Sequence, residues 1–440
     1  MRREIELCIE KIAFGGAGFG HLEGKACFMP FAAPGDRVRG RVIKEKSSYI
    51  EAELLSVMEP SPDRIEPVCP VFGQCGGCAL QHLSYANQLQ WKELLFAEQL
   101  WRFARVGREA CAPIFGADSP WSYRSRVQIK LRWIDNRLLM GFYRSGSHFV
   151  IPIPGSCAIA HPRINDLIGE LHPLLSRSPE PERIPQVDLT VSDSGESIVI
   201  VHYIGHDSKN IASFLADNLA EFPSAGGIWL QTGRKESLQL IKGIDQLTYS
   251  VPAGLTTGMP HLLMAFSRGG FSQVHYQQNL NLVRLTMEGA GLSGQERVLD
   301  LFCGNGNLTL PLASSARNVV GVEEYEPSIA DARRNAADNG VGNVSFVCAD
   351  ADAEIRRLIQ LGETFDVIVL DPPRSGALQL MHQLPLLQPQ RLVYVSCNPV
   401  TLARDVAILM ENGFRVAKAT PLDMFPQSFH IESVTLLERS

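Results

Sequence analysis

The sequence lacks the features that would place it among membrane, secreted or low-complexity proteins. It contains no run of about 18 apolar residues, so a membrane span is not expected. The N-terminus shows no apolar segment of signal-peptide length, and no internal repeat or low-complexity tract occurs. The net charge of -6 argues against a uniformly basic coat for nucleic acid, although it permits local basic patches. We therefore expect a cytoplasmic globular protein that is monomeric and has no membrane partner.

The length and the cysteine count give positive information. A chain of 440 residues is long for one hydrophobic core, so two or three domains are expected. Its 10 cysteines, in a chain with no export signal, point away from a disulfide framework and towards metal binding or catalysis.

Residues 1–58 show the pattern of a small β-barrel. Apolar and polar residues alternate over residues 4–12, and a glycine-rich turn follows. Further β-like runs occupy 26–30, 36–42 and 51–58. Arg37, Arg39 and Arg41 would project from one face of a strand, which predicts either a basic strip for RNA or a solvated strand face. The glycine-rich turn, the Pro-Gly-Asp-Arg-Val run and the basic strand resemble a TRAM domain, an OB-like RNA-binding module.

Cys69, Cys75 and Cys78 lie together on a loop rich in glycine and proline. Glycine lets the backbone turn tightly enough to direct several thiolates at one metal centre. Zinc and an iron–sulfur cluster both take four ligands in such sites, so a fourth ligand must come from elsewhere. Cys157, on another Pro-Gly loop, is the first choice and Cys111 the second. Spacing alone does not choose between zinc and iron–sulfur.

A basic and aromatic segment extends from Arg102 to Arg144, with nine Lys or Arg residues against three acids. Its interleaved rings are Trp121, Tyr123, Trp133, Phe142 and Tyr143. The alternation of Arg124 and Arg126 places both on one predicted face. Cations can hold phosphates while exposed rings stack on unpaired bases, which favours an RNA interface. The alternative is a half-exposed sheet with its rings in the core.

The C-terminal part is typical of repeated β/α units. A strand at 297–301 leads into a Gly-x-Gly turn, and three later strands end near Glu323, Asp350 and Asp371. This order predicts a doubly wound parallel sheet with polar groups at the carboxyl ends of its strands. The run from Asp300 to Gly306 resembles motif I of the S-adenosylmethionine (SAM) methyltransferases.

Cys397 follows a short apolar strand, 392–395, that we expect to stop at Pro399, because proline has no N–H to donate. A cysteine at the end of such a strand is placed for function, although a buried structural thiol is the plainer interpretation. Glu432 lies in an apolar, aromatic-rich segment. Partial burial would raise its pKa and suit it to proton transfer, whereas a lone Glu is more often solvated. For His430, a packing role and a functional role are equally consistent with the sequence.

Together these motifs resemble the RNA uracil-C5 methyltransferase family, specifically its TRAM-containing, iron–sulfur branch that acts on 23S rRNA. The resemblance covers nearly the whole chain. It implies Cys397 as nucleophile and Glu432 as base. It implies a [4Fe–4S] cluster on Cys69, Cys75, Cys78 and Cys157. It implies SAM contacts from Gln273, Phe302, Asn307, Glu323, Asp350 and Asp371.

The expected architecture has three parts. Residues 1–58 form an OB-like TRAM barrel. Residues 59–265 form a central α+β domain with the iron–sulfur site and a basic, RNA-facing region. Residues 266–440 form a doubly wound, Rossmann-like SAM-dependent methyltransferase domain.

The chemistry explains the residue types. Uracil C5 is a weak nucleophile, and a thiolate that adds to C6 places electron density on C5, which can then take a methyl group. A base must afterwards remove the C5 proton so that the cysteine is expelled. We therefore expect methylation of uracil C5 in RNA, with 23S rRNA favoured, and a lowered pKa for Cys397. The alternatives are a tRNA uracil-C5 enzyme, a cytosine-C5 enzyme, and a non-catalytic RNA-binding iron–sulfur protein.

Overall fold

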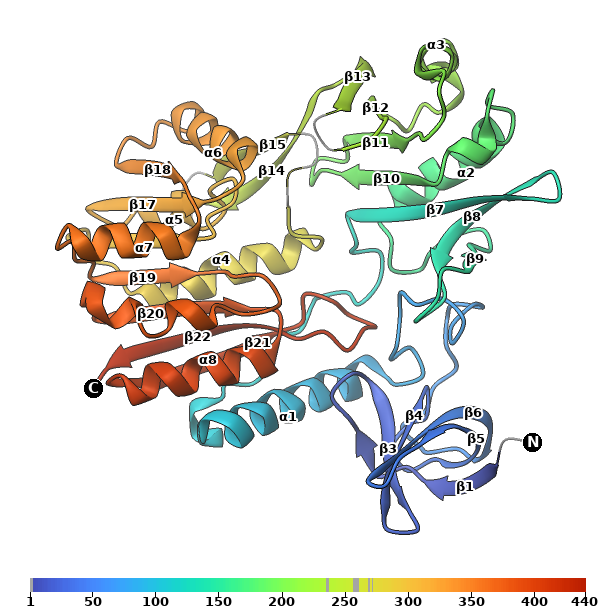
Figure 1. Cartoon of the computed structure of the whole chain (residues 1–440), viewed down its shortest axis with the longest axis horizontal. Coiled ribbons are helices and arrows are strands. Elements are labelled where there is room, and N and C mark those ends of the chain that lie inside the picture. The colour runs from blue at the N-terminus through green and yellow to red at the C-terminus, as the bar shows by residue number, and fades with distance from the viewer. Residues whose placement is uncertain (1–2, 235–236, 256–260, 268–269, 271) are drawn as a thin grey trace.

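The computed structural model describes residues 3–234, 237–255, 261–267, 270 and 272–440. Figure 1 shows a small barrel in blue, a central sheet in teal and green, and a larger α/β unit in orange and red. The first part of the chain thus lies beside the last, and the central sheet lies above the barrel in this view. None of the helices in the described ranges has both the length and the hydropathy to span a lipid bilayer.

The N-terminal barrel is a six-stranded sheet in the order β1-β5-β6-β4-β3-β2. Its strands are β1 (Glu4–Cys8), β2 (Lys11–Ile12), β3 (Ala17–Leu22), β4 (Lys25–Pro30), β5 (Arg37–Glu45) and β6 (Tyr49–Glu59). Strand β5 buries Val38 and Val42 and turns its arginines outward, as the alternation predicts. Gly40 is favoured at the inner face of β5, because an added Cβ would lie 2.9 Å from the backbone carbonyl oxygen of Glu53 on β6.

Each arginine of the predicted basic strip is paired with a carboxylate of a neighbouring strand. Arg37 and Arg39 pair with Glu59 and Glu6, and Arg41 pairs with Glu53. The face is therefore a set of exposed ion pairs rather than a strip of free positive charge. Solvent screens such exposed pairs and they stabilise the fold little, so a phosphate could displace the carboxylates at little cost.

The central sheet has seven strands in the order β13-β12-β11-β10-β7-β8-β9. These are β7 (Arg126–Ile134), β8 (Arg137–Tyr143), β9 (Val150–Pro152), β10 (Gln186–Val191), β11 (Ser197–His202), β12 (Gly227–Gln231) and β13 (Leu238–Gly243). Helices α2 (Pro162–Ser176) and α3 (Ser208–Asp217) pack on it around a separate apolar core. A two-stranded ribbon, β14 (Gln246–Pro252) with β15 (His261–Ser267), leads to the C-terminal part.

The C-terminal sheet has seven strands in the order β18-β17-β16-β19-β20-β22-β21. They are β16 (Arg297–Leu301), β17 (Asn318–Glu323), β18 (Val344–Cys348), β19 (Val367–Leu370), β20 (Arg391–Ser396), β21 (Phe414–Leu422) and β22 (Glu432–Arg439). The first five are parallel, as predicted, but β22 runs antiparallel to both β20 and β21. The predicted repeats are thus parallel, and the sequence analysis did not predict the last two strands, where a hairpin with a long loop replaces a helical crossover.

Helices cover both faces of this sheet. They are α4 (Tyr276–Ala290), α5 (Thr309–Ala313), α6 (Glu326–Asp338), α7 (Ala351–Gln360) and α8 (Pro399–Glu411), joined by α1 (Tyr85–Ala104) from the central part of the sequence. Along β20, Leu392 and Tyr394 face the core with α1, α7 and α8, while Val393 and Val395 face the core with α4 and α5. Helix α1 packs directly on α8, so a segment far away in the sequence supports the C-terminal sheet.

Strand β20 does not stop where the sequence suggested. It ends at Ser396, and Pro399 is instead the first residue of α8. Asn398 caps this helix through its side-chain oxygen, which accepts a hydrogen bond from the Val400 N–H at 3.1 Å. Cys397 is therefore held in a two-residue connection between a buried strand and a capped helix.

Candidate functional site

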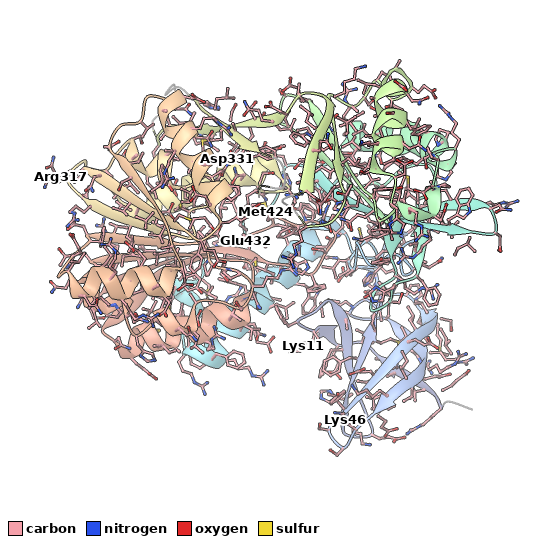
Figure 2. The ribbon with its side chains drawn as sticks, turned by 45° about the horizontal axis from the view of Figure 1, so that its top comes forward. Lys11, Lys46, Arg317, Asp331, Met424 and Glu432 are labelled. Atoms are coloured by element: carbon pink, nitrogen blue, oxygen red, sulfur yellow. The ribbon has the colours of Figure 1, made fainter. Side chains whose placement is uncertain are left out.

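Cys397 and Glu432 lie next to each other because of the register between β20 and β22. Ser396 is paired with Ser433 in the antiparallel ladder. The residue after Ser396 and the residue before Ser433 therefore lie side by side at the sheet edge. Figure 2 shows Glu432 where the C-terminal sheet faces the other parts of the molecule.

The carboxyl of Glu432 is buried, with only 4% of the residue exposed. Burial raises its pKa well above the ordinary value, Asp371 raises it further, and Arg374 opposes the rise. The carboxyl therefore holds its proton more tightly than a solvated Glu. This is the direction that the sequence predicted for a proton-transfer group.

The Cys397 thiol is half-buried, and its pKa moves in the direction opposite to our expectation. Burial is the largest cause and, together with the charges of Glu432 and Asp371, raises the pKa to about 11, although the charge of Arg374 and its hydrogen bond to the thiol oppose the rise. The predicted lowered pKa of Cys397 was therefore wrong. The reason is that desolvation and two neighbouring carboxyls disfavour the thiolate more than one guanidinium favours it.

A small cavity of about 40 Å³ lies at the carboxyl ends of β16 and β19. Its lining includes Asp371, the carboxyl that raises the pKa of both Cys397 and Glu432. Gln273, Phe302, Asn307 and Asp371, four of the six predicted SAM contacts, all line it. Phe302 has a left-handed backbone (φ 64°), which is uncommon for an aromatic residue and marks a sharp turn after β16. Phe271, which lies two residues before the predicted contact Gln273, is outside the described residues.

Asp300 adds an unusual group near this cavity. It is fully buried, and its Oδ2 accepts a hydrogen bond from the Thr309 hydroxyl at 2.5 Å. Its Oδ1 is buried without a partner in the described part of the chain. Burial raises the pKa of Asp300 to about 7. A buried acceptor without a donor is the kind of group that a ligand amine or hydroxyl can satisfy.

The other two predicted cofactor residues lie at the ends of the next two strands. Glu323 ends β17, and its two oxygens accept the backbone N–H groups of Gly304 and Tyr325 at 3.3 and 3.0 Å. Asp350 is the N-cap of α7, and its Oδ1 accepts the Ala353 N–H at 2.9 Å. Both are at the carboxyl edge of the sheet, and both already make local hydrogen bonds that would compete with a ligand.

The four predicted cluster cysteines come together around one large cavity of about 850 Å³. Burial raises the pKa of Cys75 and of Cys78, and the neighbouring thiols, including Cys157, raise it further. Cys111 lies elsewhere, where its backbone forms an isolated β-bridge with that of Ala419 on β21. The thiols do not form a group tight enough for a single metal ion anywhere in the described ranges. A four-iron cluster binds each thiolate to a different iron and so holds the sulfurs further apart than one zinc ion does.

The cysteine cavity is also lined by cations and rings from the basic segment. Arg124, Arg126, Lys130, Arg144, Phe142 and Tyr143 all contribute to its wall. Tyr123 does not, because it is buried, stacked on His275, and donates a hydrogen bond to the Pro426 carbonyl at 2.9 Å. Tyr123 therefore fits the interpretation of rings in the core, whereas the cations line a cavity, and the RNA interface stays a prediction.

Comparison with known proteins decides the family. The sequence model of the tRNA (Uracil-5-)-methyltransferase family matches residues 84–440, and that of the TRAM domain matches residues 1–55. The chain belongs to the tRNA (uracil-5-)-methyltransferase family. It is therefore a SAM-dependent RNA uracil-C5 methyltransferase with an N-terminal TRAM domain.

Relatives within the family match over nearly their whole length. Proteins of Nitrosococcus oceani and Alkalilimnicola ehrlichii, both named 23S rRNA (uracil(1939)-C(5))-methyltransferase RlmD, are 36% and 35% identical. The alignments cover 98% and 100% of this chain and 95% and 97% of the relatives. The fold matches the crystal structure of the Pyrococcus abyssi tRNA (uracil-54, C5)-methyltransferase with S-adenosyl-L-homocysteine. That match has a TM-score of 0.76 and 24% identity, covering 98% of this chain and all of that one.

Several residues around the site of this methyltransferase were not predicted from the sequence. The hydroxyl of Tyr249, on the β14–β15 ribbon, lies within hydrogen-bond distance of the Oδ1 atoms of Asn305 and Asn307 and shares its one proton between them, and Tyr249 also lines the small cavity. Gln88 and Lys92 of α1 are buried against the loop that precedes Glu432. A usable signal for the α1 pair exists, because a Gln and a Lys four residues apart lie on the face that carries the apolar residues.

Proposed function

We propose that this enzyme methylates C5 of a uridine in 23S rRNA and works as a cytoplasmic monomer. The full-length similarity to relatives named for 23S rRNA is the observation that supports this choice of substrate. The likeness to a tRNA enzyme is a likeness of fold at 24% identity, so it keeps tRNA as the second candidate.

We assign the covalent step to Cys397. Its sulfur adds to C6 of the uracil, and the electron pair of the C5–C6 double bond moves into the enolate, which makes C5 nucleophilic. Bound SAM supplies the methyl group that C5 takes. The hydrogen bond from Arg374 favours the thiolate and opposes the neighbouring carboxyls. The uracil must be unpaired or flipped out of its stack to reach this pocket.

We assign the second proton transfer to Glu432. It removes the proton left on C5, the electron pair re-forms the C5–C6 double bond, and the Cys397 sulfur leaves. The buried position suits a base that must take a proton from carbon away from water. Its raised pKa means that the carboxyl must first lose its own proton, and the positive charge of Arg374 favours that loss.

We propose Gln273, Phe302, Asn307, Glu323, Asp350 and Asp371 as the SAM-binding residues. The enclosed cavity is too small for a whole nucleoside. The methionine end would lie there, with the ribose and adenine along the open edge formed by Glu323 and Asp350. The unpaired Asp300 Oδ1 supports a ligand at this edge.

We also propose a [4Fe–4S] cluster on Cys69, Cys75, Cys78 and Cys157. Support comes from the four thiols around one cavity, whose described wall residues include no carboxylate, and from their mutual effect on pKa. The reaction needs no redox step, so the group would support structure or RNA binding. Iron and acid-labile sulfide after anaerobic purification would be expected, and tetrahedral zinc alone would refute this assignment.

The deciding experiment uses labelled methyl-SAM with unmodified 23S rRNA or tRNA, followed by nucleoside digestion. Label in 5-methyluridine from rRNA supports the proposal, and label from tRNA alone moves the substrate to the second candidate. Label in 5-methylcytidine, or no label, contradicts the assigned mechanism. Cys397→Ala should abolish methylation and keep SAM binding, and turnover by that variant would refute the covalent step.

A further inference from the structure

The loop from Asp423 to Ile431 delivers Glu432 to the site, and most residues of its first half are bonded to other parts of the chain. Asp423 and Phe425 accept hydrogen bonds from Lys92 Nζ at 2.6 and 3.0 Å. Pro426 accepts one from Tyr123. Both donor residues lie far away in the sequence. The loop is therefore held by the central part of the chain rather than by its own strands.

Gln427 is the most heavily bonded residue of this loop. Its backbone N–H donates to Gln88 Oε1 at 3.0 Å, and its side-chain Oε1 accepts from Gln88 Nε2 at 2.9 Å. Gln88 Nε2 also donates to the Leu83 carbonyl at 3.0 Å. Both side chains are buried, with 1% of each residue exposed. A buried amide that is satisfied in this way fixes the position of its partner.

The cysteine loop holds the same residue from the other side. The N–H groups of Ala79 and Leu80, directly after Cys78, donate to the Gln427 carbonyl at 2.8 and 3.0 Å. Gln427 itself has φ 67°, a conformation that a non-glycine residue keeps only where its surroundings impose it. The backbone that leaves the proposed cluster thus contacts the loop five residues before Glu432.

We propose that Gln88 and the backbone after Cys78 clamp Gln427 and thereby position Glu432 for removal of the C5 proton. On this inference the four-cysteine site acts on the second half of the reaction, through the loop, and not on methyl transfer. The inference rests on the proposed role of Glu432. Gln88 is a positioning residue, because it acts on the reacting groups only through Gln427.

The order of the reaction steps determines which species accumulates when Glu432 is poorly positioned. Addition of Cys397 and methyl transfer come before the C5 proton is removed. A loosened Glu432 therefore slows only the release of methylated RNA, and the covalent protein–RNA adduct accumulates. A general loss of stability would reduce both half-reactions together and would not enrich the adduct.

The test compares Gln88→Met with Gln90→Met in the full chain. Both changes replace a glutamine of α1 with an unbranched apolar residue, but Gln90 is exposed, on a different face of the helix from Gln88. We expect Gln88→Met to keep the single-turnover rate of methyl transfer and to release product about 10- to 100-fold more slowly, with adduct visible on denaturing gels. Gln90→Met should match the wild-type protein. Equal release by both variants would overturn the inference.

A second measurement covers the case in which Gln88→Met folds poorly. Gln427→Gly keeps the positive φ without strain and removes only the side-chain bond, so a milder accumulation of adduct is expected. Hydrogen exchange supplies a readout without activity: the Gln427 N–H should lose protection in Gln88→Met, and the same N–H should lose protection when iron is removed by a chelator. Unchanged protection in both would refute the clamp. Absence of 5-methyluridine with the wild-type protein would instead refute the proposed function.

Discussion

Replacing Glu432 with glutamine should stabilise the folded protein at neutral pH. Glu432 is 4% exposed, and its pKa is raised above the ordinary 4.5 by burial and by Asp371. Between that ordinary value and the raised one, the folded protein keeps a proton that the unfolded chain has released. The free energy of unfolding therefore falls as pH rises, by about 1.4 kcal/mol per pH unit for one proton. Glutamine is neutral at every pH and removes this dependence.

The measurement is the midpoint of urea unfolding at a series of pH values, for wild-type protein and for Glu432→Gln. The difference between the two should grow by about 1.4 kcal/mol per pH unit above the ordinary pKa of a glutamate and level off above the raised folded-state pKa of Glu432. Glu438→Gln serves as the control on the same strand, because Glu438 lies near the surface and pairs with Arg415. That control should give no stabilisation that grows with pH. Parallel curves for wild type and Glu432→Gln would refute the argument that burial holds a proton on this carboxyl.

Three further predictions concern other parts of the molecule. Alkylation of Cys397 by iodoacetamide, followed by peptide mass spectrometry, should be slow at neutral pH and rise about tenfold per pH unit towards its pKa of about 11, and Arg374→Leu should slow it further; a rate independent of pH would contradict this. Lys92→Met should cost about 3–5 kcal/mol by leaving Asp423 buried and unpaired, and adding Asp423→Leu should recover most of that cost in denaturation experiments; two additive destabilisations would argue against a buried pair. Replacing the three arginines of β5 with glutamine should weaken RNA binding. In a plot of the logarithm of the binding constant against the logarithm of salt concentration, the slope should become shallower by about 0.7–0.9 for each phosphate that is no longer neutralised. An unchanged slope would mean that these arginines stay paired with glutamates.

Local sequence patterns predicted much of the fold. The alternation over residues 4–12, the glycine-rich turn and the β/α order after Arg297 were enough to predict a barrel followed by a Rossmann-like unit. These features depend on neighbours in sequence, because strand and helix periodicity is a property of a few consecutive residues. The antiparallel β22 was missed for the same reason: strand order in a sheet is a long-range choice that no local pattern specifies.

The charge environment of individual side chains was predicted less well than their positions in the fold. The basic strip of β5 was correctly oriented, but its glutamate partners lie on other strands and could not be read from residues 37–46. The pKa of Cys397 was placed in the wrong direction, because the sequence shows a cysteine after a strand and not the desolvation around it. Both errors concern groups brought close by folding, whose distances and burial decide their charge.

The sequence by itself determined which chemical groups the protein has: a cysteine at the end of a buried strand, a carboxyl in an apolar segment, and four thiols on glycine-rich loops. Only the tertiary structure decided which of them meet. The Ser396–Ser433 register places Cys397 beside Glu432 across 35 residues of chain, and Gln88 reaches Gln427 over a separation of 339 residues. Such contacts depend on packing helices against a sheet and on pairing distant strands, so they follow from the whole core and not from any one motif.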